Sequence, residues 1–125
     1  MGKLESNKKK KEDALYNTAF ELFTTKGTNK TTISDIVEKA GVAKGTFYLY
    51  FKDKYDIRNK LVSHESSKLF KHAAANLTQY CLKNNLTLGF EDKIIFIADH
   101  IINALNEDKT LLTFISKNLS WGIFR

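Results

Sequence analysis

The 125-residue sequence contains no proline and a single cysteine, Cys81. Proline interrupts helices, so its absence, together with long stretches of 3.6-residue apolar period, predicts an all-α chain. One cysteine excludes an internal disulfide. No apolar run is long enough to span a membrane, and the lysine-rich N-terminus lacks the apolar core of a signal peptide. We therefore expect a cytoplasmic protein with no membrane partner.

Residue patterns that carry catalysis are also lacking. The sequence has no glycine-rich phosphate loop and no recognisable Ser-His-Asp or Cys-His motif. Of its three histidines, His64 and His72 lie about two helical turns apart, and His100 is remote in sequence, so their spacing does not predict a metal triad. We expect no enzyme activity, no metal and no cofactor.

Positive charge is concentrated in the first half of the chain. Residues 1–60 hold 13 Lys and Arg against 8 Asp and Glu, whereas residues 61–125 hold 7 against 6. The net charge of +6 therefore comes mainly from the first half. Such a surplus is typical of a surface that faces phosphates, although a lysine-rich chain can also simply be a soluble one.

Residues 31–54 predict a helix, a tight turn and a second, short helix. The first helix covers about Ile33–Ala40, with Thr32 as its N-cap and Asp35 completing a capping-box-like pair. Gly41 supplies the backbone freedom that a tight interhelical turn needs. The apolar residues of the first helix fall on one face, namely Ile33, Ile36, Val37 and Ala40.

The second helix, about Lys44–Phe51, is rich in aromatic residues. Phe47 and Phe51 share one face at i, i+4, so we expect them to be buried beneath the helix. Tyr48 lies about 100° round from Phe47 and should be partly exposed. This layout is typical of the helix-turn-helix that reads duplex DNA.

The segment from about Lys11 to Val62 resembles the tetracycline-repressor (TetR) family of bacterial transcriptional regulators. The most specific part is Lys44–Lys54, which reads K-G-T-F-Y-x-Y-F-K-x-K. One departure is Ala43, where the family commonly has Ser or Thr. The resemblance implies a three-helix DNA-binding head followed by a helical regulatory domain.

The remaining helices follow from apolar periodicity and end signals. A first helix should begin near Lys9–Asp13, after a frayed lysine-rich arm, and end at Lys26 before Gly27. Asp53 should cap a long helix over about 54–82, and further helices should cover about 90–106 and 110–119. In the helix over 90–106 we expect broad burial of Ile94, Ile95, Ile97, Ala98, Ile101, Ile102 and Leu105.

We predict two domains, a DNA-binding head over 1–53 and a partial ligand-sensing and dimerisation domain over 54–125. The long helix that begins at residue 54 joins them. Family members carry further C-terminal helices, so the resemblance implies a truncated regulator that ends at Arg125.

The resemblance further implies a ligand-released repressor, a homodimer in its full-length form, that binds a palindromic operator in double-stranded DNA. The second helix of the motif would enter the major groove. We expect Lys44, Thr46 and Leu49 to face base edges, and Tyr48, Tyr50 and Lys54 to hold phosphates. The residues expected to touch the flanking backbone are Thr32 and Ser34.

A small-molecule effector is also implied, although the sequence does not identify it. Its pocket would be lined by Phe70, Tyr80, Phe96, His100, Phe114 and Trp121. Ordinary core packing also explains this aromatic set. The alternative function is a truncated or degenerate helical interaction module of the same fold that does not bind an operator.

Overall fold

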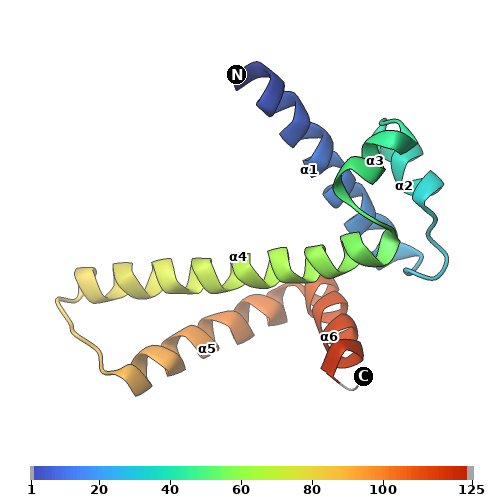
Figure 1. Cartoon of the computed structure of the whole chain (residues 1–125). Coiled ribbons are helices and arrows are strands. Elements are labelled where there is room, and N and C mark those ends of the chain that lie inside the picture. The colour runs from blue at the N-terminus through green and yellow to red at the C-terminus, as the bar shows by residue number, and fades with distance from the viewer. Residues whose placement is uncertain (1, 124–125) are drawn as a thin grey trace. The chain divides into compact units, whose positions relative to one another are not determined.

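The computed structural model describes the backbone of residues 2–123 and the side chains of residues 6–118, and this part of the chain contains six helices and no strand (Figure 1). The predicted all-α class is confirmed. The helices are α1 (Gly2–Thr25), α2 (Ile33–Ala40), α3 (Lys44–Tyr50), α4 (Lys54–Lys83), α5 (Phe90–Glu107) and α6 (Lys109–Ile123).

The chain forms two compact units, residues 1–61 and 62–125, and α4 is continuous from one into the other. The first unit, here called the head, therefore includes the first turns of α4, beyond the domain boundary expected after residue 53. The assignment of residues 54–125 to ligand sensing and dimerisation remains a prediction.

The head has a continuous apolar core. One apolar stripe of α1 is buried throughout, at Leu15, Ala19, Leu22 and Phe23. It meets α2 and α3, and the ring of Tyr16 packs edge-on against Phe51 with ring centroids 5.1 Å apart. The largest fully buried apolar side chains of the head are Leu15, Ile36, Phe47, Ile57 and Leu61. This core fixes the orientation of the two short helices, α2 and α3.

The loop between α1 and α2 is held by its own Thr31 and by Lys54 of α4. Gly27 follows the end of α1, where the sequence predicts the helix to stop, and has a φ of 86° in the left-handed region. The hydroxyl of the buried Thr31 donates to the Gly27 carbonyl at 2.8 Å. From the start of α4, the Lys54 ammonium donates to the carbonyls of Thr28 and Thr31 at 2.8 and 2.9 Å. A third carbonyl, that of Asn29, lies 3.3 Å from the same nitrogen.

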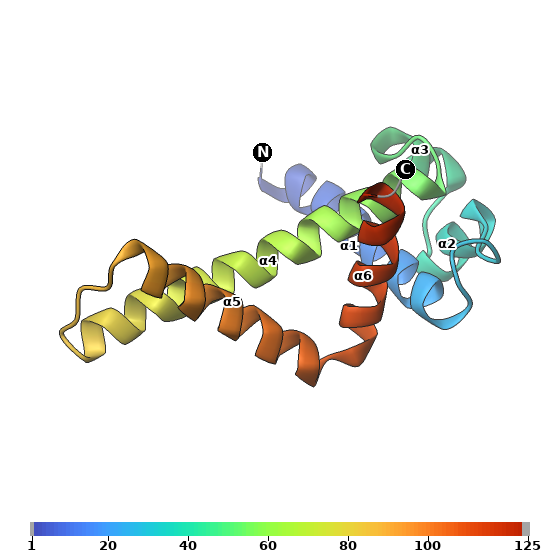
Figure 2. The same cartoon turned by 90° about the horizontal axis from the view of Figure 1, so that it is seen from below.

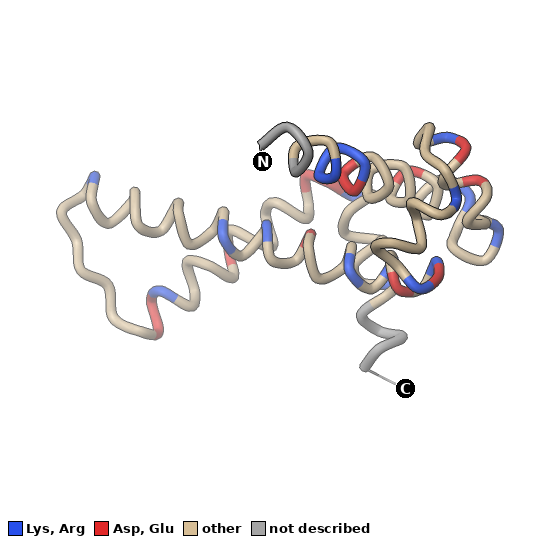
Figure 3. The backbone as a smooth tube through the Cα atoms, turned by 45° about the horizontal axis from the view of Figure 1, so that its top comes forward, with Lys and Arg blue, Asp and Glu red and all other residues tan. Residues whose placement is uncertain are grey.

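The first helix begins at Gly2, so the expected start near Lys9–Asp13 was wrong. Residues 2–13 contain no proline and no β-branched residue, and lysine and glutamate are good helix formers. The lysine run at 8–11 therefore continues the helix (Figure 3), and its side chains are exposed. The Tyr50 hydroxyl donates to the Lys8 carbonyl at 3.3 Å and joins the end of α3 to this part of α1.

In the second unit, α4 and α5 run side by side (Figures 1 and 2), and Tyr80 packs on Phe96 with ring centroids 5.3 Å apart. The broad burial expected for α5 was wrong, because none of its residues is buried. Ile94, Ile95 and Ile102 are 50%, 64% and 57% exposed. Apolar residues surround much of α5, but its neighbours α4 and α6 cover only part of its circumference.

Candidate nucleic-acid interface

The start of α2 is fixed by a capping box. The Thr32 hydroxyl oxygen accepts a hydrogen bond from the Asp35 N–H at 3.0 Å, and the Asp35 carboxylate accepts from the Thr32 N–H at 3.0 Å. The Lys26 ammonium lies 3.1 Å from the same carboxylate. The Thr32 N–H and then Lys26 hold the pKa of Asp35 below its usual value. Since the Thr32 oxygen only accepts in this box, its own O–H remains able to donate to a phosphate.

The turn after α2 sets the direction of α3. Gly41 has φ of 73°, its N–H donates to the Glu38 carbonyl, and the Val42 N–H donates to the Val37 carbonyl. This pair of bonds is the Schellman arrangement, which reverses the chain after a helix within two residues. The glycine predicted for this turn is thus confirmed in the left-handed conformation that a side chain disfavours.

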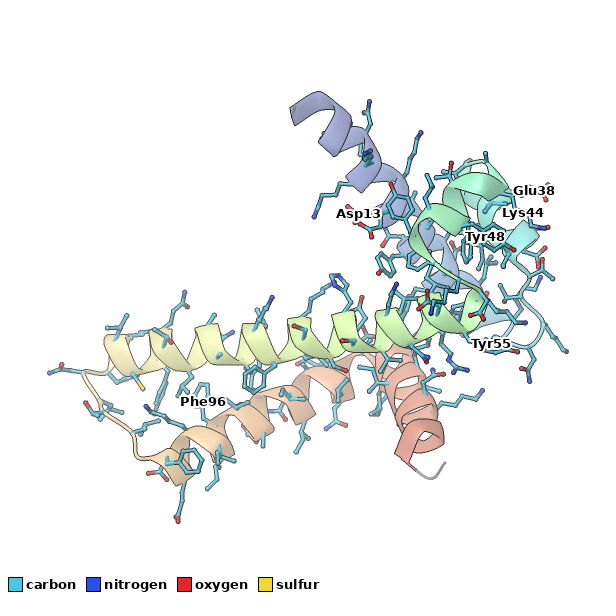
Figure 4. The ribbon with its side chains drawn as sticks, in the orientation of Figure 1. Asp13, Glu38, Lys44, Tyr48, Tyr55 and Phe96 are labelled. Carbon is cyan, nitrogen blue, oxygen red and sulfur yellow. The ribbon has the colours of Figure 1, made fainter. Side chains whose placement is uncertain are left out.

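Side chains of α3 divide into a buried and an exposed face. Phe47 and the following Phe51 are 0% and 3% exposed, whereas Tyr48 is 52% and Leu49 is 78% exposed. The predicted burial of Phe47 and exposure of Tyr48 are confirmed. Figure 4 shows Lys44 and Tyr48 among the side chains that α3 carries. A short helix that exposes Lys44, Tyr48 and Leu49 over an aromatic anchor fits the dimensions of a major groove.

The beginnings of α2 and α3 are brought together by two of the predicted DNA-contacting residues. The Lys44 ammonium donates to the Ser34 hydroxyl oxygen at 3.4 Å, and both side chains are exposed. Thr46, on the flank of α3, is half-buried. Three of the predicted contacts, Thr32, Ser34 and Lys44, therefore lie on neighbouring helix starts, where one duplex can meet all three.

Two residues that are predicted to contact phosphates, Tyr50 and Lys54, make hydrogen bonds within the head. The Tyr50 hydroxyl is bonded to the Lys8 carbonyl, and the Lys54 ammonium is bonded to the carbonyls of the α1–α2 loop. Both residues therefore position helices, and their phosphate contacts remain predictions. The sequence gives no signal for the Lys54 contacts, because they join residues more than 20 positions apart.

The predicted effector residues are only partly brought together. Tyr80 and Phe96 are in contact, Phe70 is 56% exposed and Phe114 is 4% exposed. The side chain of Trp121 lies outside the described residues. The pocket itself therefore remains a prediction.

His100 meets a histidine that the sequence does not pair with it. Its Nε2 lies 3.2 Å from the Nδ1 of His72, across α4 and α5. Within the described part of the chain, no three His, Cys, Asp or Glu side chains are grouped to hold a metal ion. Among the same residues, no helix is both long enough and apolar enough to cross a membrane.

The sequence of the chain is similar to sequences of bacterial regulatory proteins. Residues 15–61 match the family model described as bacterial regulatory proteins, tetR family. The HTH-type transcriptional regulator YvdT of Bacillus subtilis (strain 168) is 44% identical over 62 residues, which are 50% of this chain and 30% of that protein. The regulator YdgC of the same organism is 32% identical over 100 residues, 78% of this chain and 48% of that protein.

A solved structure shares the fold. The fatty acid degradation regulator FadR from Bacillus halodurans superposes with a TM-score of 0.63 at 23% identity, covering 83% of this chain and 51% of that one. The chain thus spans about half, or less, of the length of each of these relatives. YvdT and YdgC are both named as HTH-type transcriptional regulators, in agreement with the prediction that the chain is not an enzyme.

Proposed function

Since the chain belongs to the tetR family of bacterial regulatory proteins, we propose that it is a DNA-binding transcriptional regulator that places α3 in the major groove. The observation that carries the proposal is the division of α3 into two faces. Phe47 and Phe51 anchor the helix in the head, while Tyr48 and Leu49 are exposed beside Lys44. The basic surplus of residues 1–60 supplies the electrostatic attraction to phosphates.

The exposed residues divide by role. Lys44 and Leu49 face base edges, since ammonium groups donate to guanine and apolar side chains contact the thymine methyl. Thr46 lies at the edge of this set. Tyr48 and the hydroxyls of Thr32 and Ser34 hold phosphates, which set the register of the helix in the groove.

The finer proposal is a cytoplasmic repressor that a small molecule releases from a palindromic operator. Two heads would be held about 34–36 Å apart, one turn of DNA, by the dimeric full-length form. The continuity of α4 from the head into the second unit supports a route that couples effector binding in the second unit to the position of the head on DNA. An effector bound near Tyr80 and Phe96 would shift the population between two spacings of the heads.

Binding to duplex DNA tests the proposal, with Lys44→Ala as the variant and Lys93→Ala as its matched control. Lys93 is an exposed lysine of α5, so both variants lower the net charge equally. We expect Lys44→Ala to weaken binding by about 1–3 kcal/mol when its contact is to guanine. Lys93→Ala should bind as the unmodified chain does.

The same measurement separates the alternative, a helical interaction module that does not bind an operator. That alternative predicts no preference between duplexes enriched from a random library and scrambled ones, and equal affinity of the two lysine variants. The positive charge surplus of residues 1–60 favours the regulator, because a surface that binds phosphates requires it and a helical interaction module does not.

A further inference from the structure

Gly45 is a glycine that the fold does not require. Gly27 and Gly41 have φ of 86° and 73°, which explains their lack of a side chain. Gly45 instead has no positive φ and lies within α3. A Cβ atom built on it meets no atom of the head within 4 Å beyond its own stretch of helix, so neither the backbone conformation nor the packing excludes an alanine.

The position of Gly45 is the middle of the exposed face of α3. At about 100° per residue, it lies about 160° round from the buried Phe47. Its neighbours on the helix surface at i+3 and i+4 are Tyr48 and Leu49, which are 52% and 78% exposed. Position 45 therefore lies on the face of α3 that contacts the duplex in the proposed function.

Glycine lowers helix stability relative to alanine, because a glycine residue loses more backbone conformational freedom on folding than an alanine does. In a helix of seven residues, a glycine without steric or conformational need therefore weakens the element that carries the interface. An interaction outside the head must therefore favour glycine, which has no side chain, at this position. Elsewhere, glycine is used where a backbone approaches a ligand closely.

We propose that Gly45 is a DNA-contacting residue, the point at which the backbone of α3 comes closest to the duplex. A side chain there holds the helix away from the groove and lengthens the contacts of Lys44 and Tyr48 beyond hydrogen-bonding distance. The inference rests on the proposed function, and it adds a steric requirement that the charged and aromatic contacts do not imply.

Gly45→Ala and Gly45→Leu test this by their opposite effects on folding and binding. Both residues are better helix formers than glycine, so the melting temperature should stay the same or rise. Affinity for the duplex most enriched from a random library by the unmodified chain should fall with side-chain size. We expect a loss of about ten-fold or more for Gly45→Leu, comparable to a lost base contact.

Gly89→Ala is the matched control, because a Cβ at Gly89 also meets nothing within 4 Å and Gly89 lies at the start of α5 in the second unit. It should leave DNA affinity unchanged. Gly45→Leu that folds and binds as tightly as the unmodified chain would overturn the inference and leave the proposed function intact. If the unmodified chain enriches no duplex at all, the proposed function fails, and the inference fails with it.

Discussion

Phe47 and Tyr48 are adjacent in the sequence and differ by one hydroxyl, yet one is fully buried and the other is half exposed. Their rings meet edge-on with centroids 5.5 Å apart, so the anchor and the interface are in direct contact. A rotation of about 100° per residue separates the two environments. Single substitutions at these positions can therefore separate folding from binding.

Tyr48→Phe removes only the exposed hydroxyl. We expect weaker binding to duplex DNA with an almost unchanged melting temperature, because the ring and its contact with Phe47 remain. Phe47→Ala should instead destabilise the head by about 3–5 kcal/mol, as loss of a buried ring does. Thermal unfolding and fluorescence anisotropy measure the two effects. A large loss of stability in Tyr48→Phe with intact affinity would contradict the assignment.

Substitution of Lys54 is a second test at the scale of single residues, because it separates a structural role from a phosphate contact. The Lys54 ammonium donates to the carbonyls of Thr28 and Thr31. Lys54→Met keeps the aliphatic stem but leaves these carbonyls without the charged donor, so we expect a loss of about 1–3 kcal/mol in the free energy of unfolding. Lys52→Met, at an exposed lysine two residues earlier, is the control. Equal stability of the two variants, with weaker DNA binding only for Lys54→Met, would restore the phosphate role.

At the scale of the elements, the sequence predicts what local chemistry decides. The Thr32–Asp35 box, the Gly41 turn and the cap at Asp53, whose carboxylate accepts from the Asp56 N–H, involve residues within a few positions of one another. The exposure of α5 could not be predicted in this way. Periodicity tells which residues share a face, but the number of neighbouring helices decides how many faces are buried.

Long-range contacts account for the other differences. The Lys54 bonds to the α1–α2 loop depend on tertiary folding, and so does the Tyr50 bond to Lys8. The polar composition of the lysine run predicts a frayed arm, but the helix propensity of lysine allows α1 to extend to Gly2. The exposed face of α3 was predictable, because its neighbours Phe47 and Phe51 identify the buried side.

The capping box of α2 predicts a dependence of stability on pH. The pKa of Asp35 is lowered in the folded state, by the Thr32 N–H first and Lys26 next. Its stabilising contribution is therefore present above its ordinary value of 3.8 and is lost as the pH falls through the lowered folded-state pKa. Asp35→Asn should show a smaller loss of stability over this acidic window in urea unfolding. Parallel curves for the two proteins would contradict the role of the carboxylate.

At the scale of the whole molecule, the proposed repressor needs two heads on one duplex. Insertion of about half a helical turn, roughly 5 bp, between the half-sites of an enriched palindrome should abolish joint binding, since it rotates one half-site to the opposite face of the DNA. Insertion of a full turn, roughly 10 bp, preserves the face and is the control. Gel mobility shifts measure both. Equal binding to all spacings would indicate independent heads.

The central claim, that the exposed face of α3 binds duplex DNA, is tested most directly by NMR. A ¹⁵N-labelled 125-residue chain titrated with duplex DNA reports a chemical-shift change for each backbone N–H. The account predicts that the large changes gather at Thr32–Ser34 and over α3, including Gly45, while the exposed apolar residues of α5 do not shift. Changes confined to α5, or no changes at saturating duplex, would contradict it.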